Sequence, residues 1–265
     1  MTPNAPLPQF RPESLWATPG QGNLGLWYDK YYHRWPAFSR LLDFNAPRSD
    51  AEKTARLEWV KQAVQTSRST HLADQLSEHA IRQRELAGNL GGQWFEACTA
   101  TKFASGLGRA HPVENGFDWH YTLGVPVLRG AGQKGIVREW AKRWLEQDPV
   151  PLLGGEERAG AVAFLPALPS TAPELCIDGT TPHLGEYYQE GQRPADWYDP
   201  RPLQWLAVAK GSLFQFAVVP LKRNDEGKRL AALACEWLKE ALSTLGAGAG
   251  TAVDRGLFEI VEPIR

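Results

Sequence analysis

Residues 203–219 read LQWLAVAKGSLFQFAVV, in which Lys210 and Gly211 separate two apolar segments. Short apolar and aromatic runs on either side of a glycine-containing turn predict a β-hairpin. We therefore expect residues 203–209 and 213–219 to form antiparallel strands that pair with each other across Lys210 and Gly211.

The segments on both sides of this hairpin follow helical and strand patterns in irregular order. Ser49 and Glu52 have the spacing of a capping box, so a helix is expected to begin there. Further helices are predicted at about 70–87, 133–147 and 226–245, and further strands at 93–103, 119–128, 161–165 and 257–261. Because no regular alternation of strands and helices is visible, the order indicates an α+β fold and not a doubly wound parallel sheet.

Composition limits the class of protein. The chain has 265 residues, of which 43% are hydrophobic and 22% charged, and its formal net charge is −1. This balance excludes a globally basic nucleic-acid binder but leaves a local basic groove open. The three cysteines are widely spaced and form no CxxC pair, which is typical of a reduced cytoplasmic protein without disulfides or a cysteine metal site. No apolar run is long enough to span a membrane, and the N-terminus lacks the apolar core of a signal peptide.

Proline content divides the chain into an arm and a domain. Residues 1–22 carry five prolines and predict a flexible arm, whereas residues 23–265 are expected to form a single domain with an irregular insertion at about 166–202. Residues 24–35 hold a cluster of Trp and Tyr. Exposed rings would stack on nucleic-acid bases, but large rings are mostly buried, which favours docking of this segment on the core.

Residues 130–135, GAGQKG, match G-x-G-x-x-G between a predicted strand and a predicted helix. A dinucleotide site also needs an acidic residue at the end of the next parallel strand. Glu156 and Glu157 lie at about the right distance but precede the next strand, so a Rossmann site is not supported. A glycine-rich turn that enters a helix still leaves backbone N–H groups for a phosphate.

Basic residues concentrate around this segment. Residues 102–143 hold seven Lys or Arg against three Asp or Glu, which gives a local excess of four positive charges. Lys134, Arg138 and Lys142 are spaced four apart and share one helix face. A second glycine-rich segment, GAGAG at 246–250, is followed by Arg255, whose guanidinium would complement a phosphate. The alternatives are a solvated helix face and a flexible connection.

Three of the six histidines, His111, His120 and His183, fall in loops or at strand ends, where a general base would lie. Most such histidines are structural. No H-x-x-x-H or H-E-x-x-H pattern supports a zinc site, and no serine-elbow motif is present. We therefore expect no metal and no cofactor.

Several segments resemble one known family. GLGRAHPVENGFDWHYTLGVPVL at 106–128, KGIVR at 134–138, DGTTPH at 178–183 followed by Tyr187 and Tyr188, the glycine-rich segment at 246–258, and NLGLWYDK at 23–30 resemble RAMP subunits of type III-B (Cmr) CRISPR effector complexes. Within that group the chain is similar to the sixth subunit, which caps the backbone filament. Departures occur at Gln133, at Leu165 and Pro166, and at Ala249, where this family usually has serine, aspartate and lysine.

This resemblance implies a ferredoxin-like, RRM-related RAMP core with helical and loop insertions. It also implies a non-catalytic, RNA-binding scaffold subunit that holds the guide RNA toward its 3′ end and meets target RNA through guide pairing. The implied protein partners are the backbone RAMP, the small helical subunit and the head RAMP, with the proline-rich arm and residues 27–35 as candidate contacts. The candidate RNA-binding residues are Arg109, Arg129, Gly130, Gly132, Lys134, Arg138, Lys142, Gly248, Gly250, Arg255 and Gly256.

Two enzymatic alternatives remain open. The first is a guide-RNA-processing endoribonuclease of the same superfamily, with His111, His120 or His183 as general base and Lys134 stabilising the developing charge. The second is a nucleotide-binding enzyme that uses residues 130–135.

Overall fold

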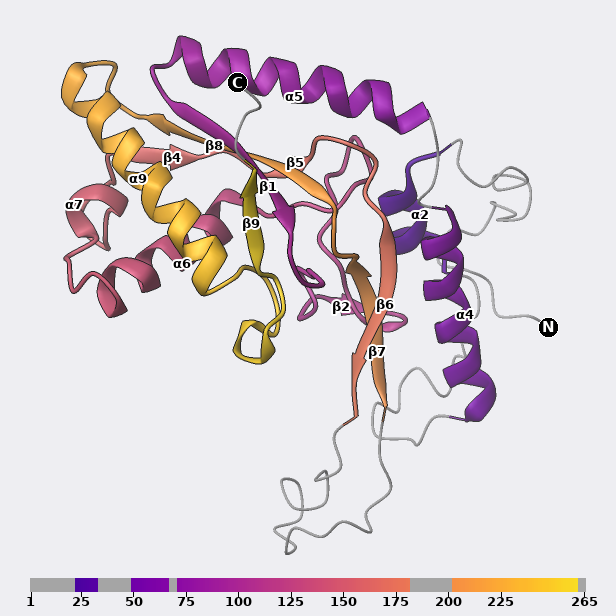
Figure 1. The fold of residues 1–265 in the computed structure, drawn as a ribbon. Coiled ribbons are helices and arrows are strands. Elements are labelled where there is room, and N and C mark those ends of the chain that lie inside the picture. Colours follow the sequence, from indigo (N-terminus) through magenta and orange to yellow (C-terminus); the bar gives the residue numbers. More distant parts are fainter. Residues whose placement is uncertain (1–21, 33–48, 67–70, 182–201, 262–265) are drawn as a thin grey trace, which may run out of the picture.

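The computed structural model describes residues 22–32, 49–66, 71–181 and 202–261. The helices are α2 (Leu24–Lys30), α4 (Asp50–Thr66), α5 (His71–Asn89), α6 (Gly130–Arg143), α7 (Val150–Leu153) and α9 (Asp225–Thr244), with a 3₁₀ turn η1 (Thr251–Val253). The strands are β1 (Gln93–Thr99), β2 (Ala110–His111), β3 (Glu114–Asn115), β4 (Val162–Phe164), β5 (Leu168–Pro169), β6 (Leu175–Thr180), β7 (Leu203–Val208), β8 (Leu213–Pro220) and β9 (Phe258–Val261). Figure 1 shows their arrangement.

The main sheet has the strand order β4-β8-β1-β9, and all of its neighbouring strands are antiparallel. Two β-α-β units follow one another along the chain, β1-α6-β4 and β8-α9-β9. In the sheet, β8 lies between the two strands of the first unit, and β1 lies between the two strands of the second. This split β-α-β topology is the ferredoxin-like fold. The expected α+β, ferredoxin-like core is therefore confirmed.

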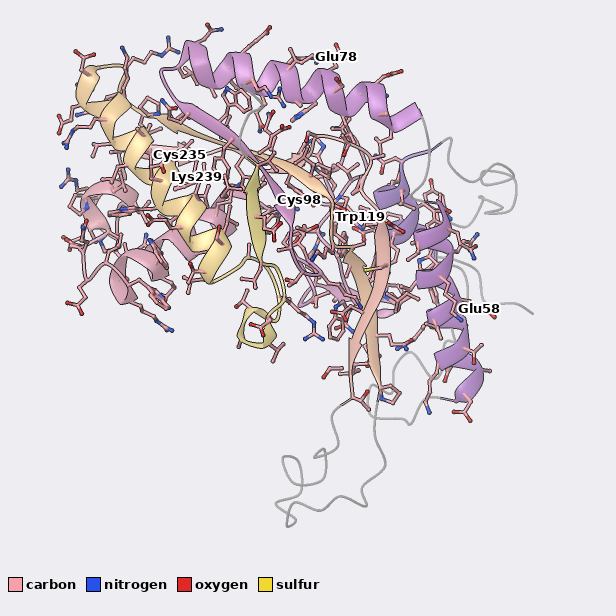
Figure 2. All side chains as sticks on the ribbon, viewed as in Figure 1. Glu58, Glu78, Cys98, Trp119, Cys235 and Lys239 are labelled. Atoms are coloured by element: carbon pink, nitrogen blue, oxygen red, sulfur yellow. The ribbon has the colours of Figure 1, made fainter. Side chains whose placement is uncertain are left out.

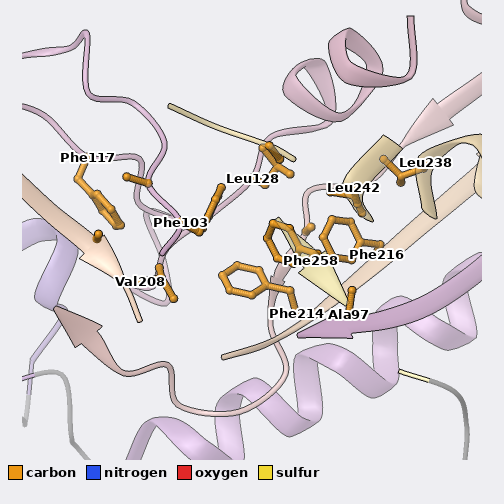
Figure 3. Close-up of a cluster of buried hydrophobic side chains, with 14 of the residues drawn as sticks. Ala97, Phe103, Phe117, Leu128, Val208, Phe214, Phe216, Leu238, Leu242 and Phe258 are labelled. Carbon is orange, nitrogen blue, oxygen red and sulfur yellow. The ribbon is translucent and has the colours of Figure 1, made fainter. Parts of the chain in front are cut away.

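Strand β8 lies inside the sheet and is buried on both faces. Phe214, Phe216 and Val218 belong to the main core under α9, whereas Ala217 and Val219 pack against α5 on the opposite face. Figure 3 shows Phe214 and Phe216 among side chains from other elements of this core. An apolar run with period-two alternation and two covered faces accounts for the nearly uninterrupted hydrophobicity of 213–220.

The predicted hairpin of residues 203–209 and 213–219 is wrong, although both strands and the turn at Lys210 and Gly211 exist. Strand β7 pairs with β6, and β8 pairs with β1, β4 and β5. Thr99 separates them: its Oγ1 donates to Ala209 O at 2.8 Å and accepts from Ser212 N at 2.9 Å. The end of β1 therefore sits in the turn, and β7 and β8 diverge around it.

The insertion predicted as irregular at 166–202 contains two strands in its described part. Strand β5 adds to β8, and β6 pairs with β7 to form a separate two-stranded sheet, against which α4 packs. Figure 1 shows this sheet projecting away from the main sheet beside α4. The rest of the predicted insertion, 182–201, lies outside the described residues.

The described part of the aromatic segment, residues 24–32, docks on the core, which is the interpretation that the sequence favoured. Trp27, Tyr28 and Tyr32 are buried, and Trp27 stacks on Trp59 of α4 with 3.7 Å between ring centroids. These three side chains are thus unavailable as subunit contacts, which corrects that expectation. Trp35 and residues 1–21 of the predicted arm lie outside the described residues.

The predicted helices and most of the other strands are found close to their expected places. The Ser49–Glu52 capping box forms, with Ser49 N donating to Glu52 Oε2 at 2.7 Å. Residues 119–128, predicted as a strand, form a compact turn that makes only isolated bridges. Within the described ranges, no helix combines the length and apolar character needed to cross a membrane.

Candidate nucleic-acid interface

The glycine-rich segment at 130–135 is the beginning of α6 and not a turn before it. Gly130 is the first helical residue, and a Cβ at this position would overlap the carbonyl oxygen of Phe164 in β4. The glycine therefore permits close packing of the helix on the sheet. Because the sheet is antiparallel and the segment is helical, the structure does not support a dinucleotide site here.

The N-terminus of α6 is not capped by a side chain. Arg129 is the N-cap residue and makes no side-chain cap hydrogen bond. Gln133, expected in the position of a family serine, is fully buried, and its Nε2 donates to the carbonyls of Leu128 and Leu165 at 3.1 and 2.7 Å. The buried Gln133 side chain thus holds the start of α6 against the core and presents no hydroxyl group to a phosphate.

Arg109 and Arg129 share one carboxylate. Arg109 Nη1 lies 3.1 Å and Arg129 Nη2 lies 3.2 Å from Oδ1 of Asp118. Both guanidinium groups are partly exposed, whereas Asp118 is largely buried. The hydrogen bond and charge of Asp118 raise the pKa of Arg129 above its usual range. The cluster holds two cations side by side in a fixed position and carries a net charge of +1.

The second glycine-rich segment forms a tight loop between α9 and β9. Gly246, Gly248, Gly250 and Gly256 all have positive φ, as does Asp254. Ala249 N donates to Ala104 O and Gly256 N donates to Lys102 O, both at 2.8 Å. Backbone hydrogen bonds therefore hold the loop against the segment that follows β1. Glycine adopts the positive φ angles of this loop without the steric strain that a side chain would add.

Arg255, at the end of this loop, is already paired. Its Nε lies 2.6 Å from Oδ2 of Asp178 in β6, and Lys102 Nζ lies 3.3 Å from Oδ1 of the same carboxylate. Burial acts to raise the pKa of Asp178, but the bonds from Arg255, the Gly179 backbone and Lys102 outweigh it and hold that pKa below its usual value. Arg255 and Lys102 thus repeat the arrangement of two cations on one carboxylate.

The two clusters lie on either side of one short segment, 104–105. Ala104 O accepts from the glycine-rich loop, while Ser105 O accepts from Asp118 N at 2.9 Å and Ser105 Oγ donates to Val127 O at 2.8 Å. The structure therefore connects both clusters to the same short segment, and Arg129 places the first cluster at the start of α6. Lys102, Asp118 and Asp178 were not among the candidate RNA-binding residues predicted from the sequence. A single sequence does not show which carboxylate pairs with which cation.

The remaining cations of α6 extend away from this region. Lys134 lies about 6 Å and Lys142 about 18 Å along the helix axis from Gly130, at 1.5 Å per residue. Arg138 donates from Nη2 to Gly154 O at 3.1 Å and so holds the connection after α7. Of the three, Lys134 is the one placed near both the helix start and Arg129.

The histidine candidates differ in access. His111 has a side chain 4% exposed, its Nε2 lies 3.0 Å from Tyr28 O, and its Nδ1 accepts from Val113 N at 3.2 Å. With both ring nitrogens engaged, His111 cannot reach an RNA hydroxyl in this structure. His120 Nδ1 accepts from Leu123 N, and its ring lies 5.8 Å from that of His79. His183 lies outside the described residues.

Among the described residues, the cysteine and acidic side chains do not gather into a metal site. In the described ranges, no group of three or more His, Cys, Asp or Glu side chains is placed to hold a metal ion. Cys98, Cys176 and Cys235 are free thiols, and Figure 2 shows Cys98 on β1 apart from Cys235 on α9. Burial raises the pKa of Cys235 to about 11, so this thiol is not an activated nucleophile.

A substitution in the glycine-rich loop tests its geometry. Gly256 has φ +72°, and a Cβ there would overlap Ala247 O, whereas Gly211 has φ +92° with open space around it. Gly211→Ala should cost about 1 kcal/mol of unfolding free energy from backbone strain alone. Gly256→Ala adds a backbone clash and should cost about 2 kcal/mol or more. Urea denaturation of both variants checks this, and equal losses would contradict the close approach of Gly256 to Ala247.

Comparisons with known proteins agree with this architecture. A family model described as the RAMP superfamily matches residues 91–259, from just before β1 into β9. A curated relative, CRISPR system Cmr subunit Cmr6 of Pyrococcus furiosus, is 34% identical over 116 residues, covering 40% of this chain and 33% of the relative. The chain thus spans about one third of the length of that relative.

One solved structure shares the fold. A chain in the cryo-EM structure of the type III-B Cmr-beta bound to cognate target RNA superposes with a TM-score of 0.68 at 19% identity, covering 94% of both chains. The crystal structure of Cmr6 from Pyrococcus furiosus gives a TM-score of 0.43 at 23% identity, covering 64% of this chain and 98% of that chain. The first of these matches extends the shared fold beyond the main sheet to nearly the whole chain.

Proposed function

We propose, from the premise that this chain belongs to the RAMP superfamily, that it is a non-catalytic RNA-binding subunit of a type III-B CRISPR effector complex in the cytoplasm. The observation that carries the proposal is the pair of clusters, Arg109–Asp118–Arg129 at the start of α6 and Lys102–Asp178–Arg255 at the glycine-rich loop. The similarity over 116 residues to a subunit named Cmr6 supports the assignment to this type of complex.

The clusters suit the phosphate backbone of RNA. Each contains two cations held in place by one carboxylate, so a phosphate meets guanidinium donors that have already lost much of their side-chain freedom. Backbone N–H groups at the start of α6 add donors without base preference. Binding is therefore expected to be tolerant of sequence and sensitive to salt.

The finer assignment concerns the place of the chain in the complex. We propose that it acts as the sixth Cmr subunit, holding the guide RNA toward its 3′ end and capping the backbone filament. Its neighbours would then be the backbone RAMP, the small helical subunit and the head RAMP. The support for this place is the resemblance of residues 106–138 and 178–183 to that subunit together with the partial identity to its Pyrococcus relative.

Salt dependence of RNA binding tests the phosphate contacts. The test variant is Arg129→Gln/Lys134→Gln, which leaves Asp118 paired with Arg109. The control is Lys228→Gln/Arg229→Gln, which removes the same charge from the start of α9, near Gly91 and thus at the opposite end of β1. With a single-stranded guide RNA that carries a repeat-derived tag, the test variant should bind about 10-fold more weakly and lose about 1.4 units of the slope of log K against log salt.

The control should retain both the affinity and the slope. A test variant with an unchanged slope would contradict the proposed phosphate contacts. The same samples test the endoribonuclease alternative. RNA cut at one defined position would assign the chain to the endoribonucleases, with His120 and His183 as the candidate general bases. Intact RNA after incubation with and without divalent metal ions supports the non-catalytic role.

A further inference from the structure

Tyr121 is the most exposed of the large hydrophobic side chains in the described part of the chain, at 70%. It lies in the compact turn that follows Trp119, and the aromatic side chains just before it, Phe117 and Trp119, are both buried. An aromatic ring of this size normally loses most of its surface on folding. Its exposure leaves the ring accessible to a binding partner.

The backbone around Tyr121 is held rigidly although the ring is exposed. His120 N donates to Val125 O and Gly124 N donates to His120 O, both at 2.7 Å. The side-chain amide of Asn23, the N-cap of α2, donates to the carbonyls of Tyr121 and Thr122 at 2.7 and 3.0 Å. The ring is thus presented from a fixed turn, and binding to it costs little loss of conformational freedom.

The ring stands next to the first cation cluster. The guanidinium of Arg129 lies 5.8 Å from the centroid of the Tyr121 ring, within the range of a cation–π contact. Arg129 is held by Asp118, which also holds Arg109. An aromatic ring therefore lies next to a cation that shares its carboxylate with a second arginine.

We infer that Tyr121 is a stacking platform for an unpaired RNA base whose neighbouring phosphate is held by Arg129 and Arg109. This inference rests on the proposed function and adds base stacking to it. Single-stranded nucleic acid is bound in this way by a basic groove with interleaved aromatic rings, because every base offers a π-face. A protein partner would not by itself account for an arginine beside the ring whose carboxylate partner also holds a second arginine.

Two RNAs of equal length separate stacking from phosphate binding. One is an ordinary single-stranded RNA, and the other carries abasic residues throughout, so that the phosphate number is the same. Tyr121→Ala should weaken binding of the ordinary RNA by about 5- to 100-fold and leave binding of the abasic RNA unchanged. Tyr121→Trp should restore binding, and 2-aminopurine fluorescence in the RNA should be quenched by wild type and by Tyr121→Trp but not by Tyr121→Ala.

A matched control removes another exposed aromatic ring. Trp144, at the C-cap of α6, is 57% exposed, and Trp144→Ala should bind both RNAs like wild type. Arg129→Gln/Lys134→Gln should weaken both RNAs equally. If that double variant loses binding while Tyr121→Ala binds both RNAs like wild type, stacking is wrong and phosphate binding stands.

Two other results overturn the inference. If wild type binds neither RNA, the proposed function fails and the stacking role fails with it. If Tyr121→Ala keeps full RNA affinity but no longer recovers the neighbouring complex subunits on co-purification, the ring is a protein contact.

Discussion

Phe216→Ala is expected to lower the free energy of unfolding by about 3–5 kcal/mol, a large part of the stability of an ordinary domain. Phe216 is fully buried on β8, stacks on Phe95 of β1 with 5.1 Å between ring centroids, and meets the edge of Phe258 of β9 at 5.6 Å. One side chain therefore joins three strands of the main sheet. Removing it leaves a cavity that these strands cannot close without shifting their register.

Equilibrium urea denaturation, followed by tryptophan fluorescence, measures this loss. The matched control is Leu221→Ala, one residue beyond β8, because Leu221 is well exposed. Its substitution should change the unfolding free energy by no more than about 0.5 kcal/mol. A loss below about 1 kcal/mol in Phe216→Ala would contradict the position of Phe216 at the junction of the three strands.

The second large effect is a loss of stability at mildly acidic pH, caused by His111. Burial lowers the pKa of His111 to about 4, and Arg109, Lys30 and Arg56 act in the same direction, against the carbonyl of Tyr28. In the unfolded chain the pKa of the same imidazole is about 6.5. Between about pH 6.5 and about pH 4, His111 is protonated in the unfolded state but neutral in the folded state. The free energy of unfolding therefore falls as the pH decreases from about 6.5 to about 4.

The size of this loss follows from the pKa difference. A difference of about 2.5 pKa units corresponds to about 3 kcal/mol, at 1.36 kcal/mol per unit. The side chain is almost entirely buried and stacked on Tyr28, with ring centroids 4.6 Å apart, so solvent screens it little. Above about pH 6.5 the contribution is constant because His111 is neutral in both states.

His111→Gln is the matched variant, since glutamine offers an N–H donor for Tyr28 O but does not titrate in this range. The difference in unfolding free energy between wild type and variant should change by about 3 kcal/mol between pH 7 and pH 4. His79 and His120, whose pKa values are also lowered, cancel in this difference. NMR titration gives a direct check, and an imidazole of His111 that protonates near pH 6.5 would contradict the prediction.

The main sheet was predictable strand by strand, but its pairing was not. Alternation located β1, and short apolar runs located β4, β8 and β9 within a few residues, because each of these strands has buried residues. The hairpin prediction failed because Thr99, from a distant part of the chain, occupies the turn at Lys210 and Gly211. No local pattern reveals a side chain inserted from more than a hundred residues away.

The sequence predicted the arginines of the candidate interface but not the carboxylates that pair with them. Local charge excess pointed to Arg109 and Arg129, and the glycine-rich loop pointed to Arg255. Asp118 and Asp178 stand in segments that carry the family resemblance, but their role as the carboxylates that hold these arginines was not predicted, because pairing depends on the fold. Tyr121 was likewise missed, since sequence alone does not tell an exposed ring from the buried rings of Phe117 and Trp119.

The strand order has a consequence for how the chain is made. Strand β1 ends at Thr99, and its sheet partners β8 and β9 begin at Leu213 and Phe258. At about 5–20 residues per second, the ribosome takes roughly 6–20 s to deliver the first of these partners. During that interval α5, which precedes β1 and contacts it, is already available to cover one face of β1. The sheet is therefore completed only after β9 has left the ribosome, and a chain truncated before β9 would leave β1 as an unpaired edge strand.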